Sequence, residues 1–284
     1  MRPQELVARL GGWADPVLLR LPGKFAAAVA QFAYKTAVIT EVEARKLRHD
    51  PTELITRALQ PALWLLVFGQ VFTRLRAIPT GDLRYIDFMA PGILAQSVLF
   101  IAIFYGISII WERDLGIVHK FLASPTPRAA LVLGKALSAS VRGLSQAVII
   151  YVLAFFLGVK VCWNPLALAG VFSTVILGAA LFSTLSLIIA CLVKTRERFM
   201  GIGQVMTMPL FFASNAIYPI AMMPKWLQVI SRINPLTYEV DALRAMMLAG
   251  GTSSFGLWLD LGVLLAAAAV LVAVAARLYP NVVR

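Results

Sequence analysis

Residues 165–193 read PLALAGVFSTVILGAALFSTLSLIIACLV, a run of apolar and small residues without any Asp, Glu, Lys or Arg. A helix needs about 20 apolar residues to cross about 30 Å of hydrocarbon, and this run is longer than that. Because the bilayer core offers no water to unpaired backbone groups, such a run crosses it as a helix. The stretch therefore predicts a transmembrane helix in an integral membrane protein of the all-α class.

The composition of the whole chain agrees with this stretch. The 284 residues are 60% hydrophobic and only 14% charged, with a mean hydropathy of +0.81, which excludes an ordinary soluble domain. The net charge of +12 would suggest a nucleic-acid partner in a soluble protein. In a membrane protein it follows from basic residues that flank the spans on the cytoplasmic side, so no nucleic acid is expected.

Charge-poor runs on either side of this stretch predict five further spans. The first is only 16 residues long and relies on flanking arginines that extend to the interface. The five runs are 58–73, 88–111, 136–159, 199–219 and 255–276.

These spans divide the chain into three parts. Residues 1–57 form a cytoplasmic segment, 58–276 a six-helix transmembrane domain, and 277–284 a cytoplasmic tail. With this topology 19 of the Lys and Arg residues fall inside and 7 outside, which favours two cytoplasmic termini in the plasma or inner membrane. Residues 34–49 mix apolar and basic side chains, which suits an amphipathic helix on the inner leaflet; a plain cytoplasmic helix is the alternative.

The charged segment 111–128, WERDLGIVHKFLASPTPR, separates two of the apolar runs. The spacing predicts a helix over 111–124 with one apolar stripe and a charged face toward the cytoplasm. A passive connector is the alternative. The stripe is Trp111, Leu115, Val118 and Leu122, and the residues off it are Glu112, Arg113, His119 and Lys120.

Residues 221–255 are too apolar for a solvated loop and too often charged for a span. We expect short helices that dip into the outer interface, with Trp226 and Tyr238 at the depth of the lipid head groups.

Residues that could carry catalysis are scarce. His49 and His119 fall in separate cytoplasmic segments, so no metal site is expected inside the membrane. The chain has no G-x-x-x-x-G-K-[ST] string, so we expect no catalytic residues and no ATP hydrolysis by this chain alone. The central parts of the predicted spans contain no ionisable residue, which argues against a proton-coupled carrier. Asp260 and Arg142, near the ends of their spans, are expected to be interfacial anchors.

Two separated motifs resemble the membrane subunit of type-2 ABC exporters, especially the daunorubicin-resistance and nodulation-factor export permeases. The first is E-R-x-x-G followed by S-P, beginning at Glu112. The second is P-x-x-x-x-P-x-W-L over 219–227, followed by N-P-L-T-Y over 234–238. The resemblance extends from about Ile39 to Val274.

The resemblance implies a permease that exports a hydrophobic or amphipathic substrate, such as a drug, a lipid or a glycolipid. It implies a dimer, with itself or a close homologue, in contact with membrane lipid and with two copies of a separate ABC ATPase that binds ATP and Mg; this chain would hold no cofactor of its own. Export of a polysaccharide or lipo-oligosaccharide is the alternative, and a proton-coupled carrier is a more distant one.

The resemblance also assigns roles to residues of this chain. A coupling helix over 111–124 would contact the ATPase, the second and fifth spans would line the translocation path, and the 221–250 segment would form an external gate. The coupling residues are Glu112, Arg113, Asp114, Leu115, Gly116, Val118 and His119; the path residues are Gln96, Phe100, Phe104, Met208, Phe212 and Asn215; the gate residues are Pro219, Pro224, Trp226, Asn234, Pro235 and Tyr238. For the path residues, packing or contact with lipid is an equal alternative.

Overall fold

The computed structural model of the protein describes residues 56, 59–75, 78–81, 83–116, 118 and 128–279. Within these ranges the chain is helical apart from turns and one isolated bridge between Val161 and Leu248. The expected all-α class is confirmed. The predicted amphipathic helix over 34–49 lies outside the described residues.

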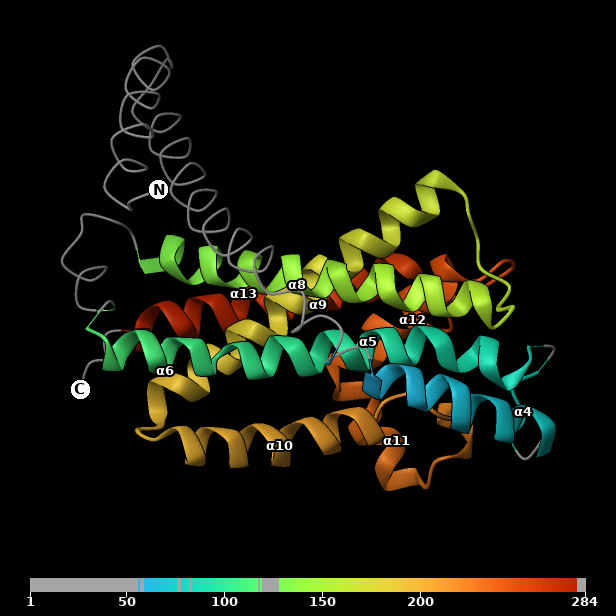
Figure 1. Cartoon of the computed structure of the whole chain (residues 1–284), viewed down its shortest axis with the longest axis horizontal. Coiled ribbons are helices and arrows are strands. Elements are labelled where there is room, and N and C mark those ends of the chain that lie inside the picture. The colour runs from blue at the N-terminus through green and yellow to red at the C-terminus, as the bar shows by residue number, and fades with distance from the viewer. Residues whose placement is uncertain are drawn as a thin grey trace, which may run out of the picture.

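The helices follow one another in the order shown in Figure 1. They are η1 (Trp64–Gly69), α4 (Gln70–Leu75), α5 (Tyr85–Tyr105), α6 (Ile107–Asp114), α8 (Arg128–Phe156), α9 (Pro165–Leu192), α10 (Arg196–Phe212), η2 (Ile220–Met222), α11 (Lys225–Ile233), α12 (Pro235–Met247) and α13 (Leu257–Leu278).

Among the described residues, four helical segments are long and apolar enough to cross a membrane: Tyr85–Asp114, Leu131–Phe156, Pro165–Leu192 and Leu257–Leu278. They match four of the six predicted spans and make this a multi-pass membrane protein. The other two predicted spans overlap the helical residues 59–75 and the 17-residue α10.

α10 ends at Phe212, seven residues before the predicted end of the fifth span at Pro219. The chain turns there because Ala213 leaves the helical conformation and Ser214 donates from its backbone nitrogen to the carbonyl of Phe211. The chain that follows packs tightly on α5: a Cβ on Gly92 would lie 2.4 Å from the backbone oxygen of Ala216. Glycine therefore permits this close approach.

Asparagine and proline together begin two of the helices. The side chain of Asn164 accepts a hydrogen bond from the backbone of Leu166, and Pro165 takes the first helical position of α9. Asn234 caps α12 in the same way, with Pro235 after it. Each cap satisfies a backbone N–H that the helix leaves unpaired, so these two-residue signals fix where α9 and α12 start.

α5 and α9 form the centre of the bundle. They pack against each other, and both contact α8 and α12, while α13 lies against α9, α12 and α8. In Figure 1, α5 runs between α8 and α13 on one side and α10 on the other. Almost every residue of α5 is buried, whereas α13 keeps most of its apolar surface exposed, as expected for a peripheral span that faces lipid.

Residues 221–255 include short helices, as expected, but the two main helices differ in position. α11 is at the surface, with the Trp226 side chain 64% exposed. α12 packs inside the bundle against α5, α9 and α13, and its residues Leu236, Val240 and Leu243 are completely buried. Tyr238, expected at head-group depth, is half-buried against the ring of Phe255.

The continuous helix predicted over 111–124 is wrong. α6 ends at Asp114, and Gly116 then adopts a positive φ of 70°, a conformation that glycine reaches without strain. Leu115 is 69% exposed, whereas Val118 is fully buried. The predicted stripe is therefore not a single face, because the helix that would align it is interrupted. His119 and Leu122 lie outside the described residues.

Candidate functional site

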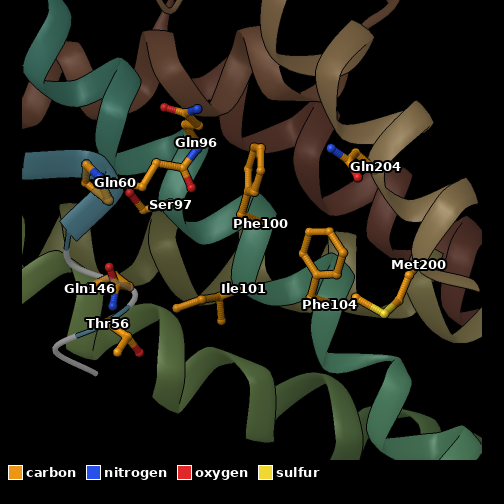
Figure 2. Close-up of a pocket in the computed structure, with 11 residues that line it drawn as sticks. Thr56, Gln60, Gln96, Ser97, Phe100, Ile101, Phe104, Gln146, Met200 and Gln204 are labelled. Atoms are coloured by element: carbon orange, nitrogen blue, oxygen red, sulfur yellow. The ribbon is translucent and has the colours of Figure 1, made fainter. Parts of the chain in front are cut away.

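A cavity of about 530 Å³ lies between the segment that precedes η1 and the helices α5, α8 and α10 (Figure 2). None of the described side chains that line it is charged, but many can form hydrogen bonds, and two are phenylalanines. The lining residues are Thr56, Gln60, Pro61, Gln96, Ser97, Phe100, Ile101, Phe104, Gln146, Met200 and Gln204. The cavity can therefore accept a molecule with apolar surfaces and neutral polar groups.

One face of α5 supplies the centre of this cavity. Gln96, Phe100 and Phe104 are spaced by four residues, so they lie above one another along the helix. The rings of Phe100 and Phe104 have centroids 6.2 Å apart and lie side by side in Figure 2. Both rings are only partly buried, whereas the α5 residues around them are buried. The cavity is thus the place where the central helix is uncovered.

Gln146 of α8 is the most constrained polar group of the cavity. Its side chain is fully buried, and neither its amide oxygen nor its amide nitrogen has a hydrogen-bond partner. A buried polar group without a partner costs about 1–3 kcal/mol. The amide is therefore available to a molecule that enters the cavity.

The six predicted path residues are not brought together. Gln96, Phe100 and Phe104 line this cavity, Met208 and Phe212 are partly exposed on α10, and Asn215 lines a different cavity.

Sequence reasoning missed Gln60, Gln146, Met200 and Gln204. The last two are four residues apart on α10 and share a face, which was a usable signal. For Gln146 the sequence carries no comparable signal.

The predicted coupling segment is tied to the turn between α9 and α10. The carboxylate of Asp114 accepts hydrogen bonds from Arg196 at 2.8 Å and from Arg113 at 3.2 Å. Arg113 also donates to the backbone oxygens of Val193 and Lys194, at 3.3 and 2.6 Å. Each exposed pair is screened by solvent and stabilises little by itself, but together these contacts hold the two polar segments as one surface.

The ring of Trp111 belongs to the same surface. The Arg196 guanidinium lies over it, 3.5 Å from the ring centroid, and such a contact adds about 0.5–1 kcal/mol at an exposed site.

Glu112 does not face the solvent, contrary to the prediction. Its side chain is 12% exposed, and it forms an ion pair with Lys135 of α8, which is 7% exposed. The reason is the position of α6 against the first turns of α8, which places this carboxylate between the two helices. Among the predicted coupling residues that the structure describes, Arg113, Asp114 and Leu115 are the ones with accessible side chains.

The predicted gate residues mark the ends of helices. Pro219 precedes η2, Pro224 precedes α11, and Asn234 and Pro235 begin α12. The amide nitrogen of Asn234 also donates to the backbone oxygen of Leu210 on α10, at 2.6 Å. The Tyr238 hydroxyl donates to the backbone oxygen of Arg232 at 2.6 Å, and Trp226 remains exposed. These contacts connect the segment to α10.

Acidic and basic side chains occur inside the bundle, although the central parts of the predicted spans contain none. The cause is α12, which folds inward and buries Glu239, Asp241 and Arg244. Both carboxylate oxygens of Glu239 lack partners, and its carboxyl occupies the space that a side chain at Gly178 of α9 would need. Asp260, expected to be an interfacial anchor, is fully buried.

Arg142, the other predicted anchor, is half-buried on α8. Its guanidinium lies over the ring of Tyr105, 4.8 Å from the centroid.

A second set of contacts lies at the opposite end of the bundle, where α5 begins. Asp87 of α5 accepts two hydrogen bonds of 2.8 Å from Arg84, and one of 3.2 Å from the backbone of Lys160. The hydrogen bond from the guanidinium to Asp87 raises the pKa of Arg84. Arg84 also donates to the backbone oxygen of Gly158. These bonds join the start of α5 to the loop between α8 and α9.

In the described part of the chain, no three His, Cys, Asp or Glu side chains gather as a metal site would require. Cys162 and Cys191 are both free and lie near opposite ends of α9.

Comparison with known proteins identifies the family. Residues 34–248 match the family model described as ABC-2 type transporter. The chain is 30% identical to the ycf38 transport permease of Cyanophora paradoxa over 201 residues, which cover 70% of this chain and 69% of the relative. It is 29% identical to the daunorubicin resistance ABC transporter permease protein DrrB1 of Streptomyces coeruleorubidus over 238 residues, or 82% of each chain.

A more distant relative is the inner membrane transport permease YadH of Escherichia coli strain K12. It is 24% identical over 195 residues, which cover 65% of this chain and 72% of the relative. The family match covers most of the sequence and includes both motifs, the cavity and α12. The chain therefore belongs to the ABC-2 type transporter family, and it is a membrane permease subunit.

Proposed function

We propose that the protein exports an uncharged or weakly charged amphipathic molecule, such as a drug, a lipid or a glycolipid. The observation that carries this proposal is the cavity between α5, α8 and α10. It combines four glutamines, from three of these helices and the segment before η1, with two aromatic rings. Glutamine amides donate and accept hydrogen bonds, so they suit hydroxyl, carbonyl and amide groups. Phenylalanine rings suit apolar or aromatic surfaces.

The energy for export comes, in this proposal, from a separate ABC ATPase that binds ATP and Mg. Family membership supports such a partner. Two permeases and two ATPase copies would assemble, with both termini and the α6 end of the bundle in the cytoplasm. Arg113, Asp114 and the 194–198 turn form one polar surface at that end, which supports it as the docking site. The 221–250 segment would form the external gate.

The similarity to a daunorubicin resistance permease supports an amphipathic aromatic substrate. The alternative, a polysaccharide or lipo-oligosaccharide, would use the same glutamines for its hydroxyl groups. A proton-coupled carrier is favoured by one observation only, the unpartnered carboxylate of Glu239 inside the bundle.

A transport assay in inside-out vesicles tests the proposal. Vesicles that contain the permease and its copurified ATPase should accumulate daunorubicin when ATP is supplied. Gln146→Leu should raise the half-saturating concentration about 3- to 10-fold, since a neutral hydrogen bond contributes about 0.5–1.5 kcal/mol. Gln70→Leu is the matched control, because Gln70 is an exposed glutamine on α4 and does not line the cavity.

Two outcomes would contradict the proposal. If both glutamine substitutions changed the half-saturating concentration equally, the cavity would not be part of the transport path. If daunorubicin accumulated in response to an imposed proton gradient and did not depend on ATP, the protein would be a proton-coupled carrier. Glu239→Gln should then abolish the accumulation.

A further inference from the structure

A second cavity, of about 560 Å³, lies at the end of the bundle opposite α6. It is bounded by the start of α5, the chain between α10 and η2, the helices α11 and α12, and the loop before α13 (Figure 1). Arg232 and Arg244 line it, and no acidic residue of the described part of the chain does.

Arg244 is held rigidly at this cavity. The residue is only 6% exposed. Its Nη2 group donates to the backbone oxygen of Asn215 at 2.8 Å and to that of Phe88 at 3.4 Å. Its guanidinium lies over the Phe88 ring, 3.9 Å from the centroid. The orientation of this cation is therefore set by the protein before any ligand arrives.

The protein leaves several of the Arg244 donors unused. The Nε atom has no hydrogen-bond partner, and Nη1 is 4.0 Å from the nearest oxygen of Asp241, which is too long for a hydrogen bond. The other oxygen of Asp241 is already engaged by Ser253 and by the backbone nitrogens of Ser254 and Phe255. Asp241 thus offsets part of the charge of Arg244 without satisfying its donors.

A second guanidinium lines the same cavity. Arg232, on α11, is exposed, and its guanidinium has no ion-pair or hydrogen-bond partner in the described part of the chain. Arg232 can donate two parallel hydrogen bonds to an oxyanion, and Arg244 can add a donor and its positive charge, so the pair matches an oxyanion.

The rest of the cavity wall is apolar. Phe88, Pro219, Ile220 and Phe255 contribute rings and aliphatic surface. The cavity also lies at an end of the membrane-spanning helices, where the phosphate groups of bilayer lipids are found. We propose that this cavity binds a phosphate group, and that the phosphodiester of an anionic phospholipid is its source.

Binding of dioctanoyl phosphatidylglycerol to the purified full-length protein, counted by native mass spectrometry, tests this inference. Dioctanoylglycerol, which has the same chains and no phosphate, and inorganic phosphate serve as the other two probes. Arg232→Gln should weaken binding of the phospholipid at least about tenfold, since a hydrogen bond to a charged group contributes about 1.5–3 kcal/mol. Because Arg232 is exposed, this substitution should not disturb folding.

Lys225→Gln is the matched control. It removes the same charge from the same helix, but Lys225 lies at the exposed start of α11 and does not line the cavity. Arg244→Gln is a second variant, and it should weaken binding further if the protein still folds. Neither ATP nor the ATPase is needed, so a failure here leaves the proposed transport function untouched.

The outcomes separate the possible sources of the phosphate. Tight phospholipid binding that depends on Arg232 but not on Lys225, with little binding of dioctanoylglycerol, supports the lipid. Inorganic phosphate binding as tightly as the phospholipid, with the same dependence on Arg232, would keep the phosphate site but overturn the lipid as its source. Equal binding by wild type, Arg232→Gln and Lys225→Gln would overturn the site itself.

Discussion

The buried ion pair between Glu112 and Lys135 should contribute more to stability than the exposed ion pair between Asp114 and Arg196. The side chains of Glu112 and Lys135 are 12% and 7% exposed. Both charges therefore lie largely out of contact with water, and the carboxylate compensates the charge of the ammonium group. In Glu112→Gln the Lys135 ammonium stays buried and loses the negative charge of Glu112. Removal of one partner of a buried pair costs about 3–5 kcal/mol.

The structure places the expected effect at the lower end of that range. One oxygen of Glu112, Oε2, has no hydrogen-bond partner, so the wild-type pair already contains an unsatisfied atom and is not at its strongest. We therefore expect a loss of about 3 kcal/mol, and a melting temperature that falls by roughly 5 to 10 °C.

Asp114→Asn is the matched control, because it makes the same chemical change two residues away. The Asp114 side chain is 40% exposed and pairs with Arg196, which is 37% exposed. Such a pair is screened by solvent, so its loss should change the melting temperature far less than Glu112→Gln does. Thermal unfolding of the two purified variants in detergent, at matched expression, measures the difference.

A double variant completes the test. Glu112→Leu combined with Lys135→Met replaces the pair by apolar side chains, and such replacements are often neutral or stabilising. The double variant should recover at least half of the free energy of unfolding that Glu112→Gln loses. Equal melting temperatures for Glu112→Gln and Asp114→Asn would refute the argument, since the carboxylate would then contribute no more than an exposed one.

Three further predictions follow from other contacts. Asp114→Lys should reduce copurification of the ATPase about tenfold while the permease still inserts, because the charge on the proposed docking surface is reversed; unchanged ATPase recovery would remove this surface from docking. Gly92→Ala should lower the free energy of unfolding by about 1–3 kcal/mol, because its Cβ would lie 2.4 Å from the backbone oxygen of Ala216. Gly201→Ala on α10 meets no atom within 4 Å and should be neutral or slightly stabilising. In a cysteine-free background, Lys160→Cys should react with an impermeant maleimide from outside the cell and Lys194→Cys should not; the reverse labelling pattern would invert the topology.

Much of the helical framework could be predicted from the sequence, because the need to pair backbone groups in a bilayer is a local constraint. The apolar run 165–193 became α9, which ends at Leu192, one residue before the predicted end. Three other long apolar runs likewise became long helices. The positions of Gln96, Phe100 and Phe104 on one face also follow from helical spacing alone, and these three residues do line the cavity.

The partners of individual side chains were decided only by the tertiary structure. Glu112 was placed on a solvent-exposed face because the sequence does not record that α8 lies against α6. Gln146 joins the cavity, and Glu239 enters the bundle, only through the packing of α8 and α12 on α5 and α9. Hydropathy and helical period describe one segment at a time, whereas burial of a polar side chain depends on which distant helix packs against it and at what rotation.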